Sequence, residues 1–189
     1  MPSKTITTPA GIARYPHLNR PDKKFSEVGN YKVNLEMSSE DAEPFIKQIE
    51  ALFSEFVEEK KRELKKDKLK IHAAPWEEND GQVQLKLNVK AVGKNKEGEE
   101  FSRQPKLFNA AGEVITDNIG GGSKLKAAVV PYLWYTASLG AGITLQPKAI
   151  QVLDLVTWGD GGSAEAYGFD VSEAKVDARA TGTDDEISW

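Results

Sequence analysis

Cations and aromatic rings lie close together between residues 119 and 135, where the chain reads Ile-Gly-Gly-Gly-Ser-Lys-Leu-Lys-Ala-Ala-Val-Val-Pro-Tyr-Leu-Trp-Tyr. Lys124 and Lys126 alternate with apolar residues, a period of two that predicts a strand with one charged face. Tyr132 and Trp134 follow a proline, which cannot donate to a ladder and so requires a strand edge or a break. Cations that track phosphates beside rings that stack on bases are typical of surfaces that bind single-stranded nucleic acid. The alternative is a barrel strand with solvated lysines and core aromatics.

The glycines of this stretch do not form a nucleotide-binding loop. The Walker A motif needs Gly-Lys-Ser/Thr, whereas here Ser123 precedes Lys124. The dinucleotide fingerprint needs a third glycine at the position where Leu125 stands. We therefore expect the glycines to allow a close approach to another backbone or to a ligand, without phosphate chemistry.

Two other stretches are candidate nucleic-acid surfaces: one places rings among cations, and the other places a ring beside a strand end. Residues 14–25 hold four cations and the rings of Tyr15 and Phe25, and two prolines predict a loop with no regular ladder there. The four cations are Arg14, Arg20, Lys23 and Lys24. Trp76 is a candidate base stacker beside a strand end. The alternatives are a solvated loop with one anchored ring for the first stretch, and a plug over a barrel mouth for Trp76.

Catalytic and metal chemistry have no support in the residues. The two histidines, His17 and His72, have no acid at a spacing that repeats a known metal pattern, and the chain has no cysteine. A Gly-x-Ser-x-Gly elbow is absent, and the densest acids lie near the C-terminus, where we expect no fixed geometry for acid–base work. The sequence predicts a protein that is not an enzyme and needs no metal or cofactor.

The net charge of −4 is unevenly distributed over the 189 residues. Residues 160–189 hold eight acids against two bases, a net charge of −6, so the rest of the chain carries +2. This predicts one folded domain over residues 1–159 and an acidic tail over 160–189. No apolar run resembles a signal peptide or a membrane span, so we expect a cytoplasmic protein without membrane association.

Residue periodicity predicts the elements that must position these side chains. Strict alternation predicts half-buried strands over residues 31–37 and 82–92, and the outward face of the second carries no acid. The run Ser38-Ser39-Glu40-Asp41 predicts the start of a long helix, with a side-chain cap and acids in the first turn. The helix carries an apolar stripe at spacings of three and four: Phe45, Ile46, Ile49, Leu52, Phe53, Phe56 and Val57. Residues 71–80 read as a loop, and weaker strands are predicted at 101–108, 143–145 and 150–158.

Five or six short strands with one long amphipathic helix predict a mainly β, OB-fold-like barrel, because closure removes the exposed sheet edges.

The runs Ile119–Lys126 and Val130-Pro131-Tyr132-x-Trp134 resemble the single-stranded-DNA-binding proteins of T-odd-type tailed bacteriophages. Weaker matches follow in order along the chain: Lys4, Tyr15, Pro21-Asp22, Tyr31-Lys32-Val33, the long helix after that strand, Lys86, and an acidic C-terminus that ends in an aromatic residue. The resemblance implies an OB barrel with its helix after an early strand. It also implies that the protein coats single-stranded DNA in phage replication and recombination, promotes annealing, and works in the host cytoplasm.

The resemblance, together with the candidates above, defines a predicted DNA-binding set. It comprises Lys4, Tyr15, Arg20, Phe25, Lys32, Trp76, Lys86, Lys124, Lys126, Tyr132 and Trp134.

The family's acidic tail competes with DNA for the groove and contacts the replicative DNA polymerase and the helicase–primase. The corresponding partner-binding residues here are Asp184, Asp185, Glu186 and Trp189. This tail is shorter and less acidic than is usual for the family, and it ends in Trp in place of Phe. We therefore expect weaker autoinhibition and a different partner polymerase, of the phage or the host. Tail exchange in a homodimer is a further implication.

Two other functions fit the same residues: a protein-interaction module of the replication machinery that does not bind DNA, and an RNA-binding OB protein. In a nucleic-acid binder, Tyr132, Trp134 and Trp76 should be partly exposed and should lie near Lys124 and Lys126, which separates it from the interaction module. A fully buried Trp134 cannot stack on a base. Recognition of the 2′-hydroxyl leaves no signature in the sequence.

Overall fold

The computed structural model describes residues 4–24 and 26–156. Phe25, the domain boundary after residue 159 and the acidic tail with Asp184, Asp185, Glu186 and Trp189 lie outside these residues. Five strands form a closed ring in which each pairs with the next: β2 (Gly11–Asp22), β3 (Asn30–Ser38), β5 (Gln82–Lys90), β10 (Gly140–Asp154) and β9 (Lys124–Thr136). Only β5 and β10 run parallel in this ring. The predicted OB-fold-like barrel is thus confirmed.

The alternating strands bury the faces that their period predicts. The inward residues of β3 are all buried: Tyr31, Val33, Leu35 and Met37. The inward residues of β5 and the one that follows it are buried as well: Val83, Leu85, Leu87, Val89 and Ala91. Burial of such side chains contributes roughly 1.5–3 kcal/mol each. This packing fixes the register of β5, and its outward residues therefore face the solvent.

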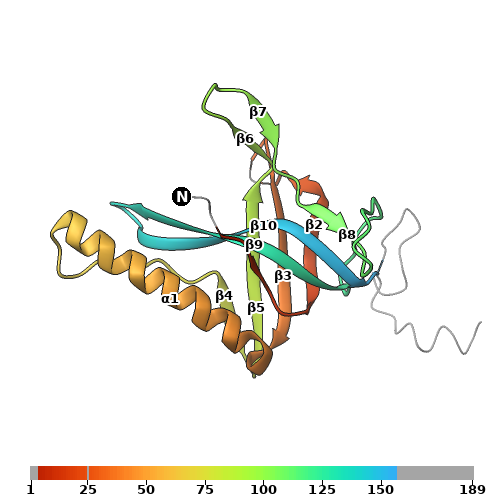
Figure 1. Ribbon diagram of the computed structural model, residues 1–189, viewed down its shortest axis with the longest axis horizontal. Helices are drawn as coiled ribbons and strands as arrows, with labels where there is room; N and C mark the ends of the chain where they lie inside the picture. Colours follow the sequence, from red (N-terminus) through yellow and green to blue (C-terminus); the bar gives the residue numbers. More distant parts are fainter. Residues whose placement is uncertain (1–3, 25, 157–189) are drawn as a thin grey trace, which may run out of the picture.

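Helix α1 (Ser39–Leu64) begins at the predicted cap, where the Asp41 N–H donates to Ser38 Oγ over 3.1 Å. Its buried residues are Ala42, Phe45, Ile49 and Val57. Leu52, which the apolar stripe placed in the core, is 37% exposed. The helix docks mainly through its first half, and the charged second half extends away from the barrel (Figure 1).

Residues 14–22 belong to a strand, so the predicted loop is wrong over this range. Strand β2 continues to Asp22, but its pairing with β3 shifts register twice, between Arg14 and His17 and between His17 and Asp22. Pro16 and Pro21 lie inside these irregular stretches, where the ladder needs no N–H from them. Tyr15 adopts a left-handed conformation there, with φ of 51°.

Three other strand predictions need correction. Residues 76–79 form strand β4 (Trp76–Asn79) along β5, in place of the predicted loop end. The single strand expected over 101–108 is two short ones, β7 (Glu100–Ser102) and β8 (Lys106–Phe108), divided at a proline. The separate strands expected over 143–145 and 150–158 are one continuous strand, β10, with a bulge near Lys148.

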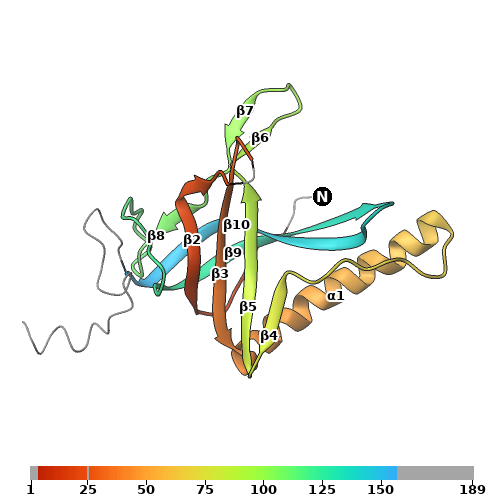
Figure 2. The ribbon, with the colours of Figure 1, turned by 180° about the vertical axis from the view of Figure 1, so that it is seen from behind.

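Two projections extend from the barrel (Figures 1 and 2). Strand β6 (Val92–Lys94) pairs with β7 into a hairpin, here called the β6–β7 arm. Strands β9 and β10 pair along almost their whole length, and their tip extends beyond the barrel on the same side as α1. The chain that leaves α1 returns along this tip, where the Ala141 N–H donates to the Lys70 carbonyl over 2.8 Å.

Pro131 lies inside the continuous strand β9, so the break predicted as one option does not occur. The short strand β1 (Ile6–Thr7) pairs with Val129 and Ala128. Pro131 lies beyond this pairing, at an edge of β9 where no described strand pairs with it. None of the described helices is long and apolar enough to cross a membrane.

Candidate nucleic-acid interface

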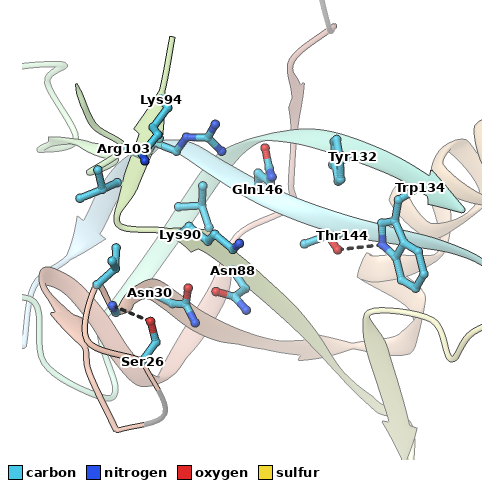
Figure 3. Close-up of a pocket in the computed structure, with 15 residues that line it drawn as sticks. Ser26, Asn30, Asn88, Lys90, Lys94, Arg103, Tyr132, Trp134, Thr144 and Gln146 are labelled. Atoms are coloured by element: carbon cyan, nitrogen blue, oxygen red, sulfur yellow. Dashed lines mark hydrogen bonds between the residues drawn. The ribbon is translucent and has the colours of Figure 1, made fainter. Parts of the chain in front are cut away.

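A groove of about 910 Å³ lies between β5, the base of the β6–β7 arm and the β9–β10 hairpin (Figure 3). Ser26, Val28 and Gly29, which precede β3, form its remaining wall. The polar and aromatic residues that line the groove are Ser26, Asn30, Asn88, Lys90, Lys94, Arg103, Tyr132, Trp134, Thr144 and Gln146. Two rings lie at one end, and Lys94 and Arg103 lie at the other.

Both rings lie on the outward face of β9 at the hairpin end of the groove. Tyr132 is 54% exposed, and Trp134 is partly buried. The Trp134 Nε1–H donates to Thr144 Oγ1 over 3.2 Å. The His72 ring contacts the same indole, with 5.2 Å between centroids and an angle of 56°. The exposure expected of base-stacking rings is therefore present, and the orientation of Trp134 is fixed.

Gly142 on the neighbouring strand makes room for this indole. The two residues are direct partners in the β9–β10 ladder. A Cβ atom added to Gly142 would overlap the six-membered part of the Trp134 ring. The indole therefore lies against the backbone of β10, which covers one side of the ring.

The charged residues that line the groove are all basic. Among the residues that the structure describes, its lining holds Lys90, Lys94 and Arg103 and no acidic residue. Within residues 4–24 and 26–156, no ion pair involves any of these three cations. Positive charge without a local counterion attracts an anionic ligand, and the effect is strongest in a concave surface.

Lys32 and Lys86, which belong to the predicted DNA-binding set, each have a carboxylate partner. Lys32 Nζ lies 2.5 Å from Asp22 Oδ2, and Lys86 Nζ lies 2.6 Å from Glu77 Oε1. The hydrogen bond from Lys32 is the main cause that lowers the pKa of Asp22, followed by the Lys24 backbone N–H. Neither lysine lines the groove.

Sequence reasoning missed most of the groove outside β9. Asn88 and Lys90 lie on the outward face of β5, which the alternation singled out as free of acids. Lys94, Arg103 and Gln146 come from the arm and from β10, and no local pattern links them to the rings. Only the closure of the barrel brings these segments together.

Lys124 and Lys126 share the outward face of β9 with the two rings but lie at its other end. Tyr132 lies six positions after Lys126, which is about 20 Å of strand at a rise of roughly 3.3 Å per residue, so the expected nearness of the rings to these lysines is wrong. Neither lysine lines the groove. The cations that do accompany the rings are those of β5 and the arm.

The glycine stretch before Lys124 has a structural role. Ser123 is fully buried, and its Oγ donates to the Gly120 carbonyl over 2.8 Å and accepts from the Val156 N–H over 2.9 Å. The Gly122 N–H donates to the Ala13 carbonyl over 2.8 Å. This loop therefore connects the ends of β9 and β10 to β2, away from the rings.

The remaining predicted residues lie in separate places. Lys4 is exposed next to β1, and Tyr15 is 76% exposed on β2. Arg20 lines a second hollow of about 460 Å³ beside β8. Trp76 packs against the hydrophobic core, which matches the alternative reading of this ring as a plug. In the described part of the chain, no group of three metal-ligating side chains gathers.

A closed five-stranded barrel with its groove across β5 and the β9–β10 hairpin defines the chain as an OB-fold protein. The family model described as "Single-stranded DNA-binding protein, Bacteriophage T7" matches residues 10–155. The chain therefore belongs to this family of phage proteins.

Individual relatives agree with this assignment. The single-stranded DNA-binding protein of Escherichia phage T7 is 30% identical over all of this chain and 93% of its own length. That of Enterobacteria phage T3 is 30% identical over 86% of this chain and 81% of its own length. The crystal structure of gp2.5, the single-stranded DNA-binding protein encoded by bacteriophage T7, has a TM-score of 0.73 at 26% identity, over 87% of this chain and 93% of that one.

A more distant solved structure shares the fold. The single-stranded DNA-binding protein of bacteriophage Enc34, in complex with single-stranded DNA, has a TM-score of 0.53 at 17% identity, over 82% of this chain and 89% of that one.

Proposed function

We propose that this protein binds single-stranded DNA without sequence preference and coats it during phage replication and recombination. The observation that carries the proposal is the groove, whose described lining combines two partly exposed rings with three cations that form no ion pair there, and includes no acid. A ring stacks only on a base whose face is free, and a duplex hides both faces of each base. The names of the relatives, all single-stranded DNA-binding proteins, support the same substrate.

The expected energetics are those of a non-specific binder. Each stacked base contributes about 1–3 kcal/mol, and stacking tolerates any sequence because every base has a π-face. Contact of three cations with phosphates gives a slope of about −2 for log K against log salt. Lys124 and Lys126 would meet a strand long enough to continue along the outward face of β9. This function needs no catalytic group, cofactor or metal.

The test is a titration of the full chain into dye-labelled oligothymidine, followed by fluorescence anisotropy at low and high salt. We expect binding that weakens with salt, with oligothymidine preferred to a duplex of the same length. Absence of binding would favour the interaction module. Tighter binding of oligouridine than of oligothymidine would favour an RNA-binding protein.

The acidic tail extends the proposal to regulation. We infer that residues 1–159 form the DNA-binding unit, and that residues 160–189, with a net charge of −6, compete with DNA for the groove cations. The combined full-length variant Asp184→Asn, Asp185→Asn, Glu186→Gln should bind oligothymidine more tightly than the unaltered chain, with the difference largest at low salt. Equal affinity at all salt concentrations would exclude competition by these three acids.

The tail is also the proposed contact for the replicative DNA polymerase, of phage or host, and for the helicase–primase. Trp189→Ala should weaken capture of the polymerase by the full chain and leave oligothymidine affinity unchanged. Unaltered capture would contradict the role of this ring. A homodimer would give twice the monomer mass in sedimentation, and a monomer at all concentrations would exclude it.

A further inference from the structure

Arg103 lies at the end of the groove opposite Trp134, where β7 leaves the β6–β7 arm (Figure 3). Its guanidinium carbon lies 5.5 Å from the centroid of the Phe101 ring. This distance allows a cation–π contact, which arginine makes through its planar face. The backbone N–H of Arg103 donates to the Ala91 carbonyl over 2.8 Å, and this bond anchors the residue at the base of the arm.

The backbone of the arm supports the guanidinium from a second direction. Gly93 is the ladder partner of Phe101. A Cβ atom added to Gly93 would overlap the guanidinium of Arg103. Arg103 thus lies between the bare backbone of Gly93 and the ring of Phe101, and its plane is held in place although no carboxylate pairs with it in the described part of the chain.

Phe101 is an unusual residue for such an arm. The residues before it, from 94 to 100, are charged or polar except for one glycine. The ring nevertheless remains 46% exposed. It neither belongs to the described core clusters nor packs against them. A ring left in solvent beside a basic groove has a free face, and this face points to an aromatic ligand.

We propose that Phe101 and Arg103 form a second base-stacking site on the path of the single strand. The ligand is a nucleobase that stacks on the free face of the Phe101 ring, which Arg103 supports from its other side, while Lys94 contacts a phosphate. The strand would run from Trp134 across Asn88, Lys90 and Gln146 to the arm. This inference rests on the proposed function, since it places a further base of the same strand.

The length of the DNA tests the second site. Sites on OB folds span about 4–16 nucleotides, so oligothymidines of about four and about twelve nucleotides should occupy one end and both ends of the groove. In the full chain, Phe101→Ala should lower the affinity for the longer oligonucleotide about five- to tenfold and leave the shorter one unchanged. Unchanged affinity for the longer oligonucleotide, or an equal loss for both with a lowered Tm, would overturn the proposal.

Two pairs of variants separate the contribution of stacking from those of charge and of apolar bulk. Arg103→Lys keeps the charge but loses the plane, and Gly93→Ala displaces the guanidinium without removing it. Both should weaken binding of the longer oligonucleotide while the salt slope stays the same. Phe101→Tyr should retain the wild-type affinity, whereas Phe101→Leu, which keeps apolar bulk, should not. Equal affinities of the Tyr and Leu variants would show that the residue only braces the arm.

The outcome also distinguishes this inference from the proposed function. If Trp134→Ala weakens both oligonucleotides and Phe101→Ala weakens neither, single-strand binding stands and the second site fails. If the unaltered chain binds no oligonucleotide, both fail.

Discussion

The indole of Trp134 lies against the backbone of Gly142, its ladder partner on the adjacent strand, where any Cβ would overlap the ring. This relationship determines what the groove can do. A tryptophan that rests on backbone and donates its Nε1–H to Thr144 is held in a fixed plane. Such pre-organisation reduces the rotamer entropy that binding must otherwise overcome.

Replacement of Gly142 by alanine should therefore impair binding through Trp134. We expect Gly142→Ala to displace the indole and to lower oligothymidine affinity by about tenfold, near the 1–3 kcal/mol of one stacked base. Gly121→Ala is the matched control, because the nearest atoms to its added Cβ lie 3.9 and 4.0 Å away. Anisotropy titrations of the two variants give the comparison. Equal affinity of both would contradict the stacking role.

The hydrogen bond between Trp134 and Thr144 should contribute less. Thr144→Val keeps the shape of the side chain but removes the acceptor, and the Nε1–H can then turn to water because the ring is only partly buried. We expect a loss of about 0.5–1.5 kcal/mol in binding, a few-fold in affinity. A few-fold loss with Thr144→Val and none with Thr144→Ser would support the assignment. A loss with Thr144→Ser as large as that with Val would contradict it.

Lys90 and Lys86 provide a matched pair for the electrostatics of the groove. They lie on the same outward face of β5, but Lys90 lines the groove while Lys86 pairs with Glu77. Lys90→Gln should flatten the slope of log K against log salt by about 0.7, the value for one phosphate contact in a single strand. Lys86→Gln should leave it unchanged. A larger change with Lys86→Gln would move the DNA path toward β4.

Ser123 should matter for stability and not for binding. Ser123→Ala leaves the Val156 N–H and the Gly120 carbonyl without this buried partner, a loss of about 1–3 kcal/mol. We expect Tm to fall by several degrees, while Ser54→Ala on the exposed face of α1 lowers it little or raises it. Oligothymidine affinity should be the same in both variants. Reduced affinity of Ser123→Ala at an unchanged Tm would assign the glycine stretch to the DNA interface.

Glu36 predicts a pH effect on stability. Hydrogen bonds from Gln84 and then Arg14 lower the pKa of Glu36 from 4.5. A carboxyl group whose pKa is lower in the folded state stabilises the protein at pH values above its unfolded-state pKa. This contribution is lost as the pH falls through its folded-state pKa. The Tm advantage over Glu36→Gln should therefore be full at neutral pH and shrink below about pH 4.5. An advantage that grows on acidification would contradict the sign.

Local patterns predicted the parts of the fold that packing does not override. The alternation in β3 and β5 corresponds to the strands that the chain forms, because burial of one face favours the same period that the sequence shows. The helix also begins within the run from residue 38 to 41, where a local side-chain hydrogen bond caps it. The loop predicted around Pro16 and Pro21 was wrong because irregular pairing removes the cost of a missing N–H. Such tolerance depends on the partner strand and leaves no trace in the prolines themselves.

The site was only partly predictable for the same reason. Tyr132 and Trp134 share one strand, so their spacing identifies them. Arg103 and Lys94 reach the groove only because the base of the β6–β7 arm lies at the end of β5. Lys124 lies far from the rings because β9 continues without a break. Contacts that require the closure of five strands cannot be read from local spacing.

The central claim is that a base stacks on Trp134 in this groove, and photo-crosslinking tests it most directly. The full chain would be irradiated with an oligothymidine that carries 5-iodo-deoxyuridine at successive positions, and the crosslinked residues identified by mass spectrometry. We expect crosslinks at Tyr132 and Trp134, with those at Trp134 lost in Gly142→Ala. Crosslinks confined to Tyr15 or Trp76, with none on the β9–β10 hairpin, would contradict the account.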